Sequence, residues 1–431
     1  MVVVVCGCLI SMIGFGPRSA LGFFLTPISA AHGWDREIFA LSVAMQTLIY
    51  GAAQPFSGAI ADRFGTVRVI IAGTLLYAAG IFMMAHASSP GTLYLSSGLL
   101  IGFGLSGCSF NLIISSFGKL LPASWRSTAF GAGTAAGSFG QFLFSPLGVY
   151  LIDSVGWRAA LEIFAGLLLM MIPLAFGVAT SRADEPGSGR VSGARTKKWP
   201  RWPLASLASA ARADAPAGPS GMPGAAQTQT YKQALAEAFG HRSYILLVLG
   251  FFTCGFQLGF VTVHLPAYLA DRGISAEVGG WTLGVIGLFN IVGAMLSGWL
   301  GGRMPKRFIL STIYFARALA VVFLITLPAS PAVALIYGAV TGLLWLSSVP
   351  PTTGLVAVMF GTRWLAMLFG VAFFSHQVGG FLGIHLGGLL YTRTGSYDAV
   401  WWLGVLFGVL SAVINLPIVE KPVPRAAAAA A

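Results

Sequence analysis

The sequence predicts an all-α integral membrane protein with twelve transmembrane helices, arranged as two six-helix halves that repeat each other in parallel orientation. The chain is 56% hydrophobic and 9% charged, whereas soluble proteins carry roughly 25% charged residues. Apolar runs of about 20 residues, enough to cross a bilayer, recur along it. Matching residues also recur in the second half at a constant spacing. Because backbone groups in lipid must be hydrogen-bonded within their own segment, we expect helices rather than strands.

The apolar segments form two sets, separated by a polar stretch. The spans predicted for the first half are 1–30, 37–61, 67–87, 92–118, 127–151 and 157–179. Those predicted for the second half are 243–270, 277–301, 307–327, 331–359, 363–390 and 397–418. These spans define an N-terminal bundle over 1–179, a linker over 180–242, a C-terminal bundle over 243–418 and a tail over 419–431. The linker is rich in Pro, Gly, Ala and Ser, which predicts flexibility, with a short interfacial helix at Tyr231–His241.

Cationic side chains gather in the loops on one side of the predicted bundle. That side receives the cations of the linker together with Arg63, Arg68, Lys119, Arg126, Arg303, Lys306, Arg307, Arg363, Lys421 and Arg425. The opposite side receives Arg36, Arg158, Arg272 and Arg393. Because cationic loops remain in the cytoplasm, the linker and both termini are predicted to be cytoplasmic. The net charge of +12 then reflects topology and contact with anionic lipid headgroups, not nucleic-acid binding.

An internal repeat relates the two halves. At an offset of 239 residues, Phe130, Gly131, Gly140, Phe142, Gly148 and Gly156 correspond to Phe369, Gly370, Gly379, Phe381, Gly387 and Gly395. At an offset of 240, Gly58 and Arg63 correspond to Gly298 and Arg303. Both halves start from the same side, so the repeat is parallel. Glycines let helices approach closely, which favours a sliding interface between the halves over ordinary close packing.

Two arginines, Arg18 and Arg317, lie deep inside apolar segments. A cation at that depth is costly unless it has a partner, and no carboxylate is expected at similar depth. An anionic substrate is therefore the expected partner, since the guanidinium fork donates two parallel hydrogen bonds to a carboxylate. Arg18 follows Gly14, Gly16 and Pro17, which weaken the helix. The alternatives are an Arg18 bonded to freed backbone carbonyls and an Arg317 that braces neighbouring helices.

Uncharged polar residues in the apolar segments complete the predicted substrate site. They are Asn111, His264, Asn290, His376 and Gln377. Either histidine could accept a proton in the physiological range, although a hydrogen-bonded buried histidine is the alternative for each. The four cysteines lack metal-ligand spacing, and the sequence contains neither a nucleotide-binding loop nor a catalytic cluster. We therefore expect neither an enzyme nor a cofactor or metal.

Several motifs resemble a known transporter family. The stretch Gly58-Ala-Ile-Ala-Asp-Arg-Phe-Gly-Thr-Val-Arg68 is similar to the loop 2–3 signature of the major facilitator superfamily. Other stretches resemble bacterial monocarboxylate porters and oxalate/formate antiporters, namely Gly14–Gly22, Arg126–Gly131, Ser145–Gly148, Gly156–Arg158 and Phe374–Gly379. This resemblance implies a major facilitator fold in a bacterial inner membrane. It also implies alternating-access transport of a small organic anion, most simply a monocarboxylate, by proton symport or anion exchange, in a protein expected to be a monomer.

The resemblance also implies a cytoplasmic gate and reveals one departure. Asp62, with Arg63, Arg68 and Arg126 on the same side, corresponds to the gate of the family. Animal monocarboxylate carriers place an Asp and an Arg in helix eight, where this chain has Asn290 and Ala294. Substrates of a different kind therefore remain open: a vitamin, a siderophore or an exported drug. A membrane sensor without transport activity is a further alternative.

Overall fold

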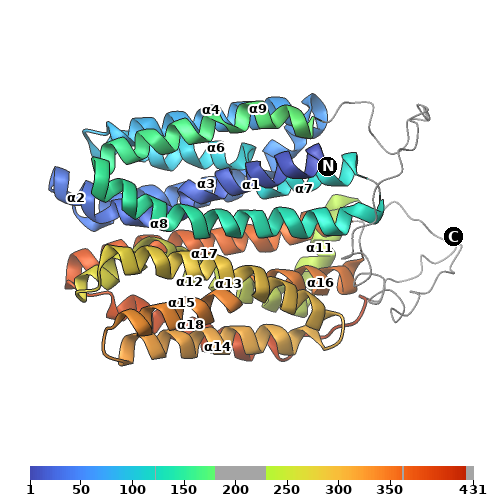
Figure 1. Ribbon diagram of the computed structural model, residues 1–431. Coiled ribbons are helices and arrows are strands. Elements are labelled where there is room, and N and C mark those ends of the chain that lie inside the picture. Colours follow the sequence, from blue (N-terminus) through green and yellow to red (C-terminus); the bar gives the residue numbers. More distant parts are fainter. Residues whose placement is uncertain (122, 180–229, 362–363, 424–431) are drawn as a thin grey trace, which may run out of the picture.

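The computed structural model describes residues 1–121, 123–179, 230–361 and 364–423. Within these ranges all regular structure is helical. The helices form two bundles that lie side by side, an N-terminal half from α1 to η3 and a C-terminal half from α12 to α18 (Figure 1). The predicted all-α membrane protein is therefore confirmed.

Three crossings of the N-terminal half are interrupted, namely the first, the fourth and the sixth. The first comprises α1 (Val2–Ala20), η1 (Leu21–Phe24) and α2 (Leu25–His32), and it is followed by α3 (Arg36–Phe64) and α4 (Thr66–Ala85). The fourth comprises α5 (Pro90–Leu93), η2 (Tyr94–Leu100), α6 (Ile101–Gly107) and α7 (Phe110–Leu120). The fifth and sixth run through α8 (Ala123–Leu169), α9 (Met171–Ala175) and η3 (Phe176–Val178). Gly156 has a φ of 83°, which is favourable for glycine, and there α8 reverses direction.

A short helix set to one side precedes the C-terminal half. This helix, α11 (Tyr231–Gly240), confirms the helix predicted at the end of the linker; Thr230 and Gln233 form its capping box. The crossings that follow are α12 (Arg242–Asp271), α13 (Ala276–Gly301), α14 (Lys306–Thr326), α15 (Pro331–Leu344) with α16 (Val349–Phe360), α17 (Leu365–Thr394) and α18 (Asp398–Asn415). Gly395, the repeat partner of Gly156, also has a positive φ, 71°. The two halves thus turn in the same way after their fifth crossings.

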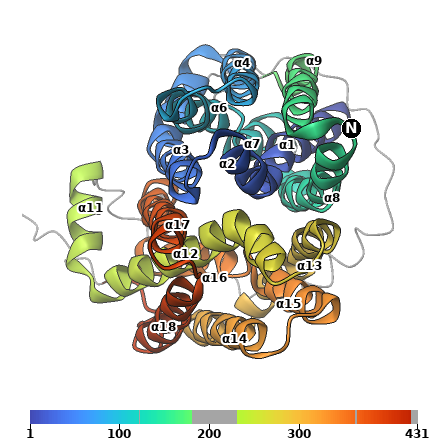
Figure 2. The same cartoon turned by 90° about the vertical axis from the view of Figure 1, so that its left-hand side faces the viewer.

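Ten helical stretches of the described residues are long and apolar enough to cross a membrane. One of them, Gly131–Val178, contains the reversal at Gly156, and α3 adds another helix of comparable length. The arrangement is consistent with twelve crossings. We call the end of the bundles that carries Arg36 the Arg36 end, and the opposite end, which carries Val178 and Tyr231, the linker end. Figure 2 looks onto the Arg36 end.

The repeated glycines that make close contacts pack inside their own half, not between the halves. A Cβ on Gly140 would lie 2.3 Å from the Met12 carbonyl oxygen of α1, and one on Gly379 would lie 2.1 Å from the Phe252 carbonyl oxygen of α12. The prediction that these glycines form a sliding interface between the halves is therefore wrong. They let the fifth and eleventh crossings touch the first and seventh backbone to backbone.

This packing predicts a large stability difference between two glycines of one helix. Gly379→Ala should lower the thermal stability strongly, because its Cβ would overlap backbone that cannot move aside. Gly370→Ala is the matched control: its Cβ would meet nothing within 4 Å, so alanine should be neutral or stabilise by up to about 1 kcal/mol. Melting of the two detergent-purified variants measures the difference. Equal melting temperatures would contradict the packing.

Most contacts between the halves follow two helix pairs, α3 with α17 and α8 with α13 (Figure 2), and η1 also packs against α12. The glycines at this interface between the halves are not the repeated ones. Positions for a Cβ on Gly51, Gly287 and Gly388 are occupied by Gln377, Ser138 and Ala40 from the other half. These contacts extend from the Arg36 end to the level of Gly51. The Cβ positions of Gly58, Gly131 and Gly370, nearer the linker end, meet no atom within 4 Å.

Candidate functional site

Arg18 lies in the last turn of α1, where the chain tightens into η1. Pro17 lies inside the helix, one residue before Arg18, and the Ser19 hydroxyl donates to the Gly16 carbonyl at 2.6 Å. The Arg18 side chain is half-buried, and its guanidinium lies 4.9 Å from the centroid of the Tyr50 ring of α3. Within the described parts of the chain no hydrogen bond or ion pair reaches this guanidinium. Its donors are therefore free to bind an anion.

An aromatic row continues from Tyr50 into the C-terminal half. The Tyr50 ring meets Phe373 of α17 edge to face at 6.1 Å, and Phe373 stacks on His376 at 5.8 Å. Arg18 and His376 are thus joined across the interface by two aromatic rings. Sequence reasoning missed Tyr50 and Phe373, since aromatic residues are common in membrane helices and no spacing distinguishes these two.

Gln377 ties this row to the N-terminal half. Its Nε2 donates to the Thr47 carbonyl of α3 at 3.3 Å, and its Oε1 lies 3.0 Å from His376 Nδ1. The Gln377 side chain is 2% exposed. Arg18, His376 and Gln377, predicted separately, therefore belong to one mid-depth cluster, which we call the central site together with Tyr50 and Phe373.

Asn290 bridges the other helix pair. Its Nδ2 donates to the Ser138 hydroxyl of α8 at 2.8 Å, while its Oδ1 accepts from the Leu346 backbone N–H at 2.9 Å. The nitrogen and the oxygen of this buried amide are thus both hydrogen-bonded. Asn290 holds an interrupted helix against the N-terminal half.

Arg317 supports the same interruption from α14. Its Nε donates to the Leu344 carbonyl at 3.0 Å, and its Nη2 donates to the Leu344 and Trp345 carbonyls at the end of α15. The side chain is 3% exposed. These bonds satisfy carbonyls that the end of α15 leaves free. These contacts are the ones expected if Arg317 braces the neighbouring helices, which was the alternative to binding an anion.

The two interruptions are related by the repeat. The break between α6 and α7 lies at Cys108 and Ser109, and an offset of 239 brings these residues to Ser347 and Ser348, between α15 and α16. Interrupted helices at corresponding positions of two transporter halves are typical of a substrate site between them. Pro350 and Pro351 lie in the first turn of α16, directly after the second break.

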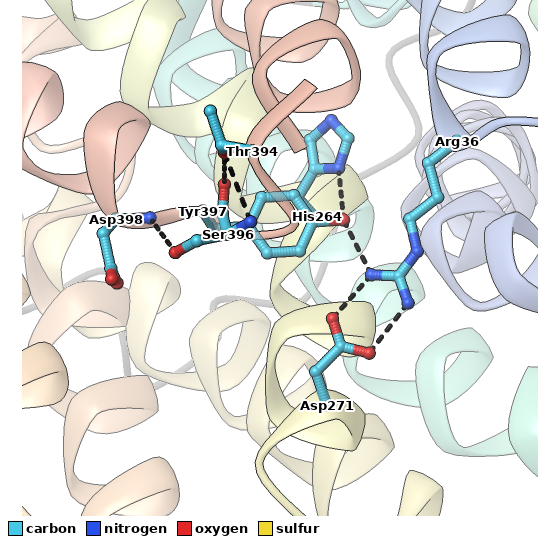
Figure 3. A network of polar contacts seen from close by, with 7 residues as sticks. All are labelled: Arg36, His264, Asp271, Thr394, Ser396, Tyr397 and Asp398. Carbon is cyan, nitrogen blue, oxygen red and sulfur yellow. Dashed lines mark hydrogen bonds and ion pairs between the residues drawn. The ribbon is translucent and has the colours of Figure 1, made fainter. Parts of the chain in front are cut away.

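His264 belongs to a separate network at the Arg36 end, shown in Figure 3. Its Nε2 lies 2.8 Å from the Ile384 carbonyl and its Nδ1 lies 3.2 Å from the Tyr397 hydroxyl. Arg36 of α3 donates to that hydroxyl at 3.1 Å and forms a two-bond ion pair with Asp271 of α12, both bonds at 2.7 Å. The network joins the N-terminal half to the C-terminal half. The sequence indicated Arg36 only as a loop cation, and no pattern in it pointed to the pairing with Asp271.

The predicted gate at the linker end is described only in part. The side chains of Asp62, Asn111 and Arg126 lie outside the described residues. Arg63 and Arg68 are exposed, and the Arg63 guanidinium lies 5.3 Å from the Phe64 ring. The described part of the chain contains no cluster of three or more His, Cys, Asp or Glu side chains suited to a metal ion.

Comparison with known proteins places these features in a transporter context. The family model of the Major Facilitator Superfamily matches residues 7–384. An uncharacterised MFS-type transporter of Bacillus subtilis, YcxA, is 26% identical over 94% of this chain and 91% of its own. Monocarboxylate transporter 13 of Bos taurus is 25% identical over 90% of this chain and 82% of its own. The crystal structure of a D-xylose-proton symporter superposes with a TM-score of 0.69 at 15% identity, covering 97% of both chains.

Proposed function

The chain belongs to the Major Facilitator Superfamily, is a multi-pass membrane transporter and not an enzyme, and from that premise we propose that it carries a small organic anion, most simply a monocarboxylate. Transport proceeds by alternating access, either as proton symport or as anion exchange. The monocarboxylate transporters among its relatives support this substrate class. The substrate proposed for this chain rests on its own residues.

The observation that carries the proposal is the free guanidinium of Arg18. It is a cation at about mid-depth of the first crossing, next to an interrupted helix, with a ring on one side and no hydrogen-bonding partner among the described residues. A cation in that position is expensive unless something anionic reaches it. A carboxylate fits because it can accept two parallel hydrogen bonds from the guanidinium edge. Phe373 and Tyr50 offer an apolar wall for the rest of a small acid.

We propose different roles for the other predicted site residues. His376, Gln377, Asn111 and Asn290 contribute hydrogen-bonding groups around the substrate. Arg317 keeps the α15–α16 break open toward the site. His264 acts at the Arg36 end, away from the anion.

The two ends of the bundles serve as alternating gates. At the Arg36 end, Arg36, Asp271 and Tyr397 close the outer side. At the linker end, Asp62 with Arg63, Arg68 and Arg126 closes the cytoplasmic side. The arrangement described above, with contact between the halves from the Arg36 end to mid-depth, represents the state open toward the cytoplasm.

Transport by purified protein in liposomes tests the proposal. Labelled acetate, lactate, pyruvate, benzoate, oxalate and formate are supplied separately, with and without an inward proton gradient. Saturable uptake of at least one monocarboxylate is expected, above that of empty liposomes. Acceleration by the gradient indicates symport, and acceleration by internal anion without a gradient indicates exchange. Uptake of none of the six would overturn the anion assignment in favour of another solute.

The orientation of the chain gives a separate prediction. The linker and both termini should be cytoplasmic in the bacterial inner membrane, because the cationic loops lie on that side. Reporter fusions at Gly193 in the linker and Gly395 between α17 and α18 check this, with a cytoplasmic signal from the first and an external signal from the second. The same signal from both fusions, or the reverse pattern, would contradict the orientation.

A further inference from the structure

We infer that His264 is a proton site that controls the Arg36 end: a proton on its Nδ1 weakens the closure between the halves and favours opening. The inference rests on the proposed function in one respect, that the Arg36 end opens and closes. It requires neither a particular substrate nor a particular coupling ion.

In this network each group donates to the next, from Arg36 to Tyr397, from Tyr397 to His264 and from His264 to the Ile384 carbonyl (Figure 3). A carbonyl oxygen can only accept, so His264 Nε2 carries a hydrogen and donates to Ile384. In the neutral ring Nδ1 then has a lone pair and accepts from the Tyr397 hydroxyl. With its own proton used in this way, the Tyr397 oxygen accepts from Arg36. The neutral histidine therefore fixes the orientation of the hydroxyl that holds Arg36.

A proton on His264 Nδ1 disrupts this order. Nδ1–H becomes a donor that faces a donor, so the Tyr397 hydroxyl must turn its hydrogen away from the ring. The imidazolium also adds a positive charge beside Arg36 in a site where His264 is 0% exposed. The Arg36–Asp271 pair is neutral as a whole, so the closed network would gain one uncompensated charge.

Among the described residues, the charged and titratable groups around His264 do not offer a second carboxylate for this charge. From α3 comes Arg36, a cation, and from α12 comes Asp271, which already accepts both Arg36 bonds. Tyr391 and Tyr268 contribute rings packed against Tyr397, at 4.5 and 6.3 Å.

Two further carboxylates belong to the same end of the bundles. Asp398 at the start of α18 has its backbone N–H bonded to Ser396, and its carboxylate points away from His264 in Figure 3. Glu37 lies in the first turn of α3, and its Cα faces Gly388 of α17. Among the described residues neither forms a hydrogen bond or ion pair with the imidazole, whose partners are Tyr397 and Ile384, so the closed state disfavours the extra proton.

Opening removes this obstacle. When the halves separate at the Arg36 end, water reaches the imidazole ring. A hydrated histidine has an ordinary pKa of about 6.5. The open state then binds one proton more than the closed state. By linkage, lowering the pH favours the open state, by up to about tenfold per pH unit below that value.

Spin-label distances across the Arg36 end test the inference without substrate. Labels are attached to cysteines at the exposed positions Ala31 of α2 and Ala276 of α13, in full-length protein with Cys6 and Cys8 replaced by serine, in lipid nanodiscs. The pH is varied from about 8 to about 5.5, the range in which histidine titrates. The population with the longer distance should grow as the pH falls. His264→Gln, which keeps a donor and an acceptor but cannot be charged, should make the population independent of pH.

His385→Gln, at another histidine of the same half, is the matched control and should keep the response. If His264→Gln does not fold, Tyr397→Phe provides the second variant: it removes the hydroxyl between the imidazole and Arg36, and the pH response should become shallower. A response that persists in both His264→Gln and Tyr397→Phe, a wild-type protein without response, or a response lost in His385→Gln would overturn the inference. Because no substrate is present, failure of the carboxylate proposal would leave this result unchanged.

Discussion

Replacing Arg18 with lysine should abolish most carboxylate transport while leaving the protein folded. A lysine keeps the charge but offers a compact ammonium, which cannot donate the two parallel hydrogen bonds of a guanidinium. The loss of such a contact costs roughly 2–4 kcal/mol, which corresponds to about 30- to 1,000-fold in affinity. The measurement is the concentration dependence of uptake in liposomes, for whichever monocarboxylate the panel identifies.

The chain offers a closely matched control for Arg18. Arg272 also lies over a tyrosine ring, with its guanidinium 4.8 Å from the Tyr268 centroid, but it is exposed at the Arg36 end. Arg272→Lys should therefore transport normally. If Arg18→Lys has an unchanged Michaelis constant in a smaller amount of folded protein, the arginine has a structural role and the proposed anion site is wrong.

Most of the fold was predictable because lipid restricts the possible structures so strongly. Apolar length alone locates crossings, and one glycine pair, Gly156 and Gly395, marks equivalent turns in both halves. The repeat did not reveal which surface each glycine serves. Gly140 and Gly51 are both single glycines in apolar helices, yet one packs inside a half and the other across the interface. That distinction depends on the rotation of each helix in the bundle, which the sequence does not specify.

The candidate site was predictable where a charge lacks a partner and unpredictable where partners come from distant helices. Arg18 and Arg317 look equivalent in the sequence, as cations at similar depth. They differ because the carbonyls of Leu344 and Trp345 come within reach of Arg317, whereas Arg18 meets a ring. His264 is likewise engaged by Tyr397, a residue more than a hundred positions away. The pair of Arg36 and Asp271 could not be identified for the same reason.

The ion pair at the Arg36 end gives the second large expected effect: Asp271→Asn should shift the protein toward the state open to the outside. The Asp271 carboxylate accepts both bonds of the Arg36 fork at 2.7 Å, and the two side chains are 33% and 15% exposed. An asparagine can accept one of these bonds and carries no charge, so the closed state loses about 2 kcal/mol. That corresponds to a shift of about 30-fold in the ratio of open to closed protein.

Labelling of a buried cysteine reports this shift. Ala40 of α3 is fully buried against Gly388 of α17, so a cysteine at Ala40 is covered while the Arg36 end is closed. A membrane-impermeant maleimide added from outside should label this cysteine many-fold faster in Asp271→Asn. Arg36→Lys, which keeps one charged bond of the fork, should give an intermediate rate.

Glu277→Gln provides the control, because it removes an exposed carboxylate at the same end without affecting the ion pair. It should label at the rate of the Ala40→Cys parent. The three variants must also melt at similar temperatures, so that faster labelling reports opening and not unfolding. Labelling of Asp271→Asn at the parent rate would mean that the ion pair does not hold the outer side closed. The energy of closure would then come from the packing of α3 against α17 and of α8 against α13.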